Sequence, residues 1–195
     1  MIYCPENLGC YWDLDRTGRK AQYSPKVEED IRAVRAIGIN VLAYATNREV
    51  KFKLEIPQIA RDDGKRDAIE RAKLVVAEIK HGGSGVAPAA LVNLMKQLAK
   101  DTGLRVSTEK REIALTQEAL FDHHLVFMHG RQSFTLSEAE RRQLRAFVER
   151  GGLLFADAVC SSEEFATSFR REMTTIFPER PLRPLSGKHP MFGTS

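Results

Sequence analysis

The chain has 195 residues, of which 43% are hydrophobic and 29% charged, a balance typical of a globular protein with a sizeable core. The formal net charge is +4 and the pI about 9.0, but acidic and basic residues are interspersed, which argues against a nucleic-acid-binding surface. No apolar run approaches the ~20 residues of a membrane helix, and the first residues lack the pattern of a signal peptide. Three cysteines, Cys4, Cys10 and Cys160, are too few for a disulfide framework and lack the spacing of structural zinc ligands.

The first part of the chain carries few regular patterns. Residues 1–23 show no apolar periodicity and are expected to be irregular. Ser24 and Pro25 predict the start of a helix, because serine caps helices and proline suits their first turn, and Gly38 predicts its end. The continuous apolar run 39–46, INVLAYAT, predicts a short strand buried on both faces.

A charged stretch, 47–70, follows and is expected to cross the surface as a loop, a hairpin or a helix. The sequence therefore divides into two parts. Residues 1–70 form an N-terminal extension or the first part of an α/β domain. Residues 71–195 form the main domain, since the regular pattern begins there.

In this second part, apolar runs alternate with amphipathic stretches. The runs predict strands at 74–79, 124–129 and 153–158, and the amphipathic stretches predict helices near 88–101, 137–150 and 163–177. A weaker extended segment spans 105–115, and the Pro-rich 178–185 is expected to be coil or an edge strand.

Local signals support the last two helices. Thr135 with Glu138, and Ser161 with Glu164, have the spacing of capping boxes at their starts. On their inner faces, Leu144, Phe147 and Phe169 are predicted to be core residues.

Solidly apolar strands alternating with helices are typical of a parallel sheet covered on both faces. We therefore expect a three-layer α/β sandwich with a mainly parallel sheet. Ligands bind such sheets beyond the carboxyl ends of the strands. Three loops lie at these ends: HGGSG at 81–85, HGRQ at 129–132 and DAVCSS at 157–162.

An acid and a thiol follow the last strand. Asp157 ends an apolar run, where a carboxylate is costly unless it is paired, capping or bound to a ligand. Cys160 lies beside Ser161, the expected cap of the next helix, and a helix N-terminus favours thiolate. The sequence leaves open whether Asp157 is a ligand or a structural acceptor, and whether Cys160 is reactive or simply a small apolar residue.

His81 and His129 each end a strand and precede glycine, so the backbone there can approach a ligand closely. Either could act as a base for Cys160, and together with Asp157 they could bind a metal ion. The alternative for both is a structural role. Gly82 and Gly83 could form an anion-binding nest, although HGGSG lacks the full spacing of a phosphate-binding loop.

A separate motif runs from Asp13 to Thr17, DLDRT, and matches the DxDxT start of haloacid-dehalogenase-type phosphatases. Its context does not fit, because no long apolar strand precedes it and Asp62 and Asp63 lie in a charged stretch. An EF-hand reading also fails, since the twelfth position holds Ser24 instead of the bidentate glutamate. We expect that this motif is not a phosphatase site.

The chain from about Lys73 to Gly193 resembles a bacterial family of domains of unknown function, number 4159. The resemblance rests on HGG after the first strand and on LVFMHGRQSFTLSEAERRQLRAFVERGGLLFADAVCSSEEFATSFRREM, and FPERPLRPLSGKHPMF closes it. That family is similar in pattern to class I glutamine amidotransferase-like domains, which implies a flavodoxin-like sheet.

The sequence departs from the amidotransferase pattern at the turn that carries the nucleophile. Asp157 lies nearest that position, Cys160 falls about three residues later, and no glycine follows it. Late in the chain only His189 occurs, followed by Pro190 and Met191, so the His-x-Glu pair is missing. The resemblance therefore does not imply an amidotransferase triad.

These patterns predict a non-enzymatic module, without a cofactor, that binds a small molecule or a protein partner and could form a homo-oligomer. Two alternatives remain, a hydrolase that uses Cys160 with His129 and Asp157, and a metal site at the sheet edge. The compartment is not defined, and the strand-like start is compatible with an excised domain of a larger bacterial cell-envelope protein. The residues expected to bind the ligand are His81, Gly82, Gly83, His129, Gly130, Arg131, Asp157, Cys160 and Ser161.

Overall fold

The computed structural model describes residues 1–15, 23–45, 73–83, 86–186 and 189. The predicted surface segment 47–70 and the residues of the DxDxT motif after Asp15 therefore lie outside the described residues. No helix in the described ranges is long and apolar enough to span a membrane.

The described residues form a three-layer α/β sandwich around a five-stranded, all-parallel sheet of order β1-β5-β4-β2-β3. The fold class predicted from the sequence is confirmed. The strands are β1 (Ile2–Cys4), β2 (Ala77–Lys80), β3 (Glu112–Ala114), β4 (Leu125–Gly130) and β5 (Leu153–Ala158). β4 and β5 are buried nearly throughout, as expected for central strands covered on both faces.

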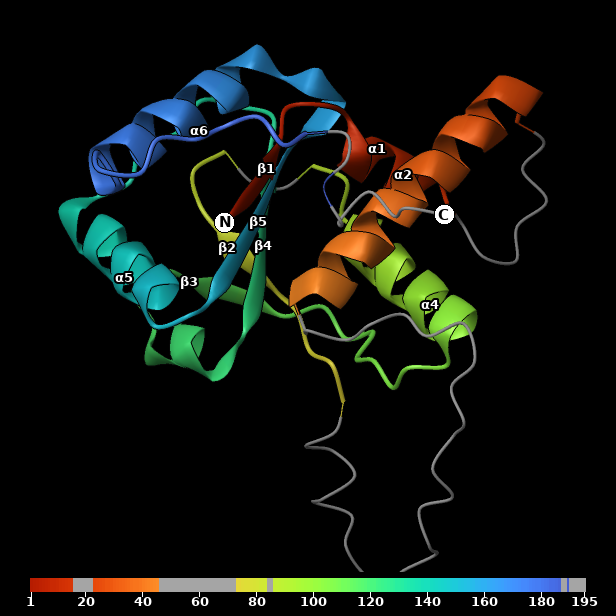
Figure 1. Ribbon diagram of the computed structural model, residues 1–195, viewed down its shortest axis with the longest axis horizontal. Helices are drawn as coiled ribbons and strands as arrows, with labels where there is room; N and C mark the ends of the chain where they lie inside the picture. Colours follow the sequence, from red (N-terminus) through yellow and green to blue (C-terminus); the bar gives the residue numbers. More distant parts are fainter. Residues whose placement is uncertain (16–22, 46–72, 84–85, 187–188, 190–195) are drawn as a thin grey trace, which may run out of the picture.

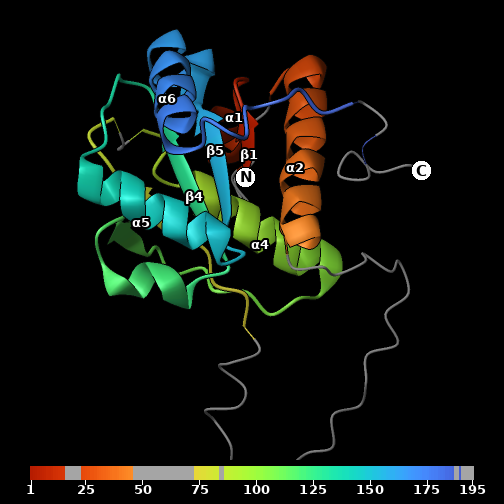
Figure 2. The ribbon, with the colours of Figure 1, turned by 60° about the vertical axis from the view of Figure 1, so that its left-hand side comes forward.

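Two helical layers cover the sheet (Figures 1 and 2). Side chains alternate across each strand, so the two faces pack against different helices. On one face lie α1 (Leu8–Leu14), α2 (Pro25–Ala45) and α4 (Ala90–Thr102), and on the other lie α5 (Glu138–Glu149) and α6 (Glu163–Ile176). The described residues also include two 3₁₀ turns, η1 (Glu118–Asp122) and η2 (Val159–Ser161).

Residues 1–23 are not irregular as expected, because β1 and α1 lie within them. β1 pairs in parallel with β5, with Cys4 opposite Asp157. A three-residue edge strand and a seven-residue helix are too short to produce a periodic pattern, and contacts with distant residues hold both in place. The N-terminal residues thus belong to the same sheet as the strands of the second part.

The strand predicted at 39–46 is wrong, because its residues continue α2 as far as Ala45. The helix begins at Pro25 as predicted but does not end at Gly38. There the missing side chain lets α2 approach its neighbours, since a Cβ would lie 2.7 Å from atoms of both Trp12 and Leu94. Short apolar runs fit buried helices as well as strands, and Val41 buries its side chain completely in α2.

The two predicted capping boxes are each displaced. α5 is capped by Ser137, whose hydroxyl accepts from the Glu140 backbone N–H while the Glu140 side chain accepts from the Ser137 backbone. α6 is capped by Ser162 and not by Ser161, because Ser161 belongs to the preceding turn. The predicted core residues Leu144, Phe147 and Phe169 are at most 2% exposed, which confirms the inner faces of both helices.

Candidate functional site

Near the carboxyl ends of its strands, the sheet carries buried ionisable side chains on the face that α1, α2 and α4 cover. His129 of β4 lies opposite Asp157 of β5 in the parallel register, and Glu78 of β2 lies opposite Phe127, two residues before His129. Alternation along the strands therefore places Glu78, His129 and Asp157 on one face. All three are at most 4% exposed, so each needs a partner.

Asp157 finds its partners at the start of α1. One carboxylate oxygen accepts from the Leu8 N–H at 3.1 Å and the other from the Gly9 N–H at 2.7 Å. Burial raises the pKa of Asp157 to about 7, and these two hydrogen bonds and then nearby His129 oppose the shift. These contacts fit the structural role that the sequence left open, an acid that satisfies backbone donors at a helix start, and its role as a ligand-binding residue stays a prediction.

His81 is held in one neutral tautomer. The Gly83 N–H donates to His81 Nδ1 at 3.1 Å, so the proton resides on Nε2, which donates to the His129 carbonyl at 2.9 Å. Burial lowers the pKa of His81 to about 4. The ring packs against Phe134 and Phe165, on the α5–α6 side of the sheet. The two histidines therefore point to opposite faces and do not converge.

The glycines at these strand ends serve close backbone packing. A Cβ on Gly130 would overlap the Gly83 carbonyl oxygen, and one on Gly83 would lie 2.5 Å from the Gln132 carbonyl oxygen. The Gly83 carbonyl accepts from the Arg131 N–H at 3.2 Å. Neither Gly82 nor Gly83 has the positive φ that is typical of an anion-binding nest, and the expected anion-binding role of this loop stays a prediction.

Cys160 lies in a strained turn beside α1. Its φ of 56° and the φ of 52° at Ser161 are both left-handed, which non-glycine residues rarely adopt. The Cys160 N–H donates to the side-chain oxygen of Asn7 at 2.7 Å. Its sulfur lies 2.6 Å from the sulfur of Cys10 in α1, a neighbour that the sequence spacing did not indicate.

The two acids of the DxDxT motif also have structural partners. Asp13 accepts from the Ala89 N–H at 2.9 Å, at the start of α4. Asp15 makes two hydrogen bonds of 2.8 Å to the Arg35 guanidinium of α2. Both carboxylates thereby hold helices together, in keeping with the expectation that this motif is not a phosphatase site.

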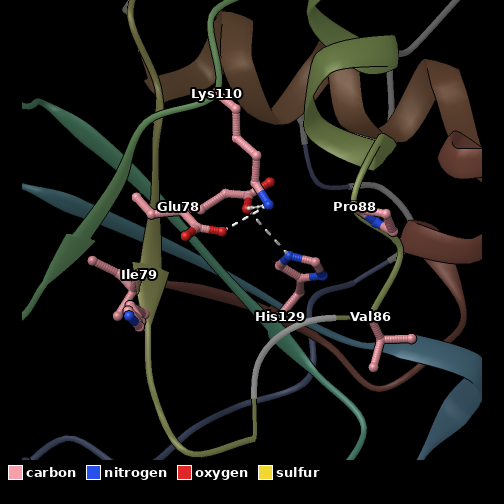
Figure 3. A pocket seen from close by; sticks show the side chains of 8 residues that line it. Glu78, Ile79, Val86, Pro88, Lys110 and His129 are labelled. Carbon is pink, nitrogen blue, oxygen red and sulfur yellow. Dashed lines mark ion pairs between the residues drawn. The ribbon is translucent and has the colours of Figure 1, made fainter.

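A small pocket opens beside His129 at the edge formed by β2 and β3 (Figure 3). Its volume is about 50 Å³. Glu78 and His129 point toward one another inside it, with Glu78 Oε2 3.7 Å from His129 Nε2. Lys110, from the segment before β3, reaches to 3.4 Å from the same oxygen and to 2.7 Å from Glu112 Oε1.

Two of the residues that line this pocket each have one buried polar atom without a hydrogen-bond partner among the described residues, Glu78 Oε1 and His129 Nδ1. Buried polar atoms are nearly always satisfied, and each orphan costs about 1–3 kcal/mol. The His129 ring is fixed by stacking on Phe127 at 4.8 Å between centroids. Val86 and Pro88 supply apolar walls. The pocket is therefore partly polar, and two of the residues that line it have a buried polar atom without a hydrogen-bond partner among the described residues.

The structure thus divides the residues that the sequence grouped together. His129 lies in the pocket, Asp157 and Cys160 contact α1, and His81 faces the other helical layer. Asp157, His129 and His81 do not form a set of three metal donors, nor does any other His, Cys, Asp or Glu group in the ranges described.

The sequence analysis missed Glu78, Lys80, Lys110 and Glu112, the charged residues that line the pocket with His129. One signal was present. Glu78 interrupts the apolar run LVVAEI, and a carboxylate inside a buried strand is as unusual as one at its end. Lys110 and Glu112 carried no signal, because a weak edge segment normally exposes such side chains.

The fold and this pocket define an α/β-sandwich protein with an incompletely satisfied polar site at its sheet edge. The family model of a domain of unknown function, DUF4159, matches residues 75–195. The chain belongs to this family, as its sequence resemblance predicted. A comparison with curated proteins gives no match.

Proposed function

We propose that the chain is a non-enzymatic binding module whose pocket at Glu78 and His129 takes a small polar ligand with N–H or O–H donors. The observation that carries the proposal is that two residues lining one cavity each hold a buried, unpartnered atom, Glu78 Oε1 and His129 Nδ1. A bound donor would satisfy both and recover the desolvation free energy that they cost.

The chemistry of the two groups selects the ligand class. Glu78 Oε2 lies 3.7 Å from His129 Nε2, and we assign the proton of the neutral ring to this nitrogen, because a carboxylate only accepts hydrogen bonds. In the neutral ring Nδ1 is then an acceptor. The free positions on both residues therefore accept, and the complementary ligand group presents two donors, as an ammonium, an amidinium or a vicinal diol does.

The volume limits how much of the ligand enters. A single water needs about 10–15 Å³ by this measure, so about 50 Å³ admits one small headgroup and no ring system. A four-atom headgroup is bounded at about −1.5 kcal/mol per heavy atom. Isolated headgroups should therefore bind no tighter than the micromolar to millimolar range.

The test is a ¹H–¹⁵N NMR titration of the full chain with guanidinium or methylammonium chloride at millimolar concentration. Tetramethylammonium, which lacks N–H donors, and acetate, which only accepts, are the control ligands. We expect saturable shifts at residues 78–80 and 129 with the two donors only. Glu78→Gln and His129→Asn should abolish them, whereas Glu109→Gln, on the exposed side of the neighbouring segment, should not. Equal shifts with tetramethylammonium, or binding unchanged in Glu78→Gln, would contradict the proposal.

A cysteine hydrolase is the second candidate, favoured by the left-handed backbone at Cys160, since strained turns concentrate at functional sites. The surroundings support it less well. The Cys160 sulfur contacts Cys10, His129 engages Glu78, and His81 is neutral and on the other face of the sheet. The likeness to class I amidotransferase-like, flavodoxin-like domains remains a proposal on the same footing, because it rests on FVERGG leading into β5 and lacks the triad.

A further inference from the structure

The contact between Cys10 and Cys160 joins two thiols that lie 150 residues apart in sequence. Their sulfur atoms are 2.6 Å apart, and a disulfide bond measures about 2.05 Å. Both cysteines are free thiols here, Cys160 exposed and Cys10 half-buried. The binding function proposed above uses neither of them.

We propose that Cys10 and Cys160 are a reversible oxidation site, which closes an intramolecular disulfide by exchange with a disulfide-bearing oxidant. The oxidant is a low-molecular-weight disulfide or an oxidised dithiol protein. This inference is independent of the pocket.

Hydrogen bonds around the two cysteines keep their sulfur atoms close together. The Cys160 backbone N–H is bound by Asn7, the residue before α1. The start of α1 is in turn bound by the Asp157 carboxylate through Leu8 and Gly9. Hydrogen bonds from both directions thus fix the turn that carries Cys160 against the helix that carries Cys10. Such fixed geometry gives a high effective concentration of one thiol at the other.

The exposures set the order of the exchange. The exposed Cys160 attacks one sulfur of the oxidant as thiolate, the oxidant's S–S bond breaks, and one thiol leaves with a proton from solvent. Cys10 then loses its proton to solvent, attacks the Cys160 sulfur of the mixed disulfide, and releases the second thiol. The two cysteines are oxidised by two electrons, and one oxidant disulfide is reduced to two thiols.

The raised pKa of Cys10 fits this order. Burial, and next the contact with the Cys160 thiol, raise the pKa of Cys10 to about 12. Cys10 therefore stays protonated while Cys160 is free. The exposed Cys160 is therefore the thiol that reacts first, and Cys10 reacts second.

The experiment is oxidation of the full folded chain by oxidised glutathione, read by peptide mapping with mass spectrometry. We expect one cross-linked peptide pair, Cys10 with Cys160, that dithiothreitol reverses. The melting temperature should rise by about 5–15 °C, because a cross-link over so long a loop restricts the unfolded chain. Cys4→Ser is the matched control and should leave the cross-link intact.

The single variants separate the steps. Cys10→Ser should stop the reaction at a Cys160–glutathione adduct. Cys160→Ser should prevent the intramolecular cross-link. Because this change is at an exposed position, it keeps the test valid if Cys10→Ser disturbs the packing. A parent chain that yields only the glutathione adduct, only intermolecular dimers, or a cross-link to Cys4 would overturn the proposal, as would a cross-link that lowers the melting temperature.

Discussion

Replacing Asp157 by alanine should destabilise the protein by an amount that depends on pH. The substitution leaves the Gly9 N–H without its acceptor and leaves the Leu8 N–H with only the Glu6 carbonyl, at 3.2 Å. An orphaned buried donor costs about 1–3 kcal/mol, so we expect a loss of about 1–3 kcal/mol in the free energy of unfolding, most of it from Gly9. Cys160→Ala, at an exposed position, should cost less than about 1 kcal/mol.

The pH dependence follows from the raised pKa of Asp157, about 7 in the folded protein against 3.8 as the ordinary value. Between these values the folded state holds a proton that the unfolded state releases. The contribution of this proton to the free energy of unfolding is fully present below about pH 4 and is lost as the pH rises through about 7. From pH 5 to pH 8 the free energy of unfolding of the parent chain should therefore fall by about 2–3 kcal/mol. The alanine variant has no carboxyl group at this position and should not show this fall.

Urea unfolding followed by circular dichroism at pH 5 and pH 8 measures both effects. Asp157→Asn, which keeps one carbonyl acceptor and removes the titration, is the matched control and should show no such pH dependence relative to Asp157→Ala. The reasoning fails if Asp157→Ala costs less than about 1 kcal/mol at pH 5, if its cost is equal at the two pH values, or if Cys160→Ala is equally destabilising.

Three further predictions concern the packing around this site. Phe169→Ala should lower the free energy of unfolding in urea by about 3–5 kcal/mol, because the ring is completely buried. A loss below about 1 kcal/mol would show that the buried face of α6 is assigned incorrectly. Gly38→Ala should lower the melting temperature, since its Cβ would lie 2.7 Å from Trp12 and Leu94, and an unchanged melting curve would contradict that packing. Asp13→Ala should lower the free energy of unfolding by about 1 kcal/mol, because α4 loses a hydrogen bond at its start. The parent chain should show no magnesium-dependent hydrolysis of p-nitrophenyl phosphate. Hydrolysis that Asp13→Asn abolishes would contradict the expectation that this motif is not a phosphatase site.

The central elements were predictable because burial and periodicity agree there. The predicted strands 124–129 and 153–158 differ from β4 and β5 by one residue at most at either end, since continuous apolar runs bounded by glycine or polar turns leave few alternatives. The predicted strand 74–79 begins before β2, because Leu74 forms only an isolated bridge to Val106.

Other elements depend on contacts that no local pattern contains. α1 has only seven residues and Asn7, at its N-cap, makes no side-chain capping bond. The helix is stabilised by Asp157 at its start and by Asn93, whose side-chain amide donates to the Trp12 carbonyl at 2.9 Å, near its end. Residues so distant in sequence cannot be assigned to one another from composition or spacing.

The same reasoning explains why the candidate site was predicted only in part. The sequence located the carboxyl ends of the strands correctly, but a loop position does not specify which face a side chain occupies. His81 and His129 look alike in sequence, yet their side chains lie on opposite faces of the sheet. Glu78 could have been identified as an acid within a buried run, whereas the ion pairs of Lys110 depend on the register of β3 against β2.

The matched family region begins at residue 75, yet the residues that satisfy Asp157 and Cys160 come earlier in the chain. Leu8 and Gly9 donate to the Asp157 carboxylate, and Asn7 accepts from the Cys160 backbone. β1 also pairs with β5, which would otherwise be the sheet edge. Within the described residues, the strand end that carries Asp157 and Cys160 is therefore completed by the N-terminal segment, whereas Glu78, Lys110 and His129 assemble the pocket entirely inside the matched region. Substitutions in α1 should consequently affect Asp157 and the cysteine pair first and the pocket only through the sheet.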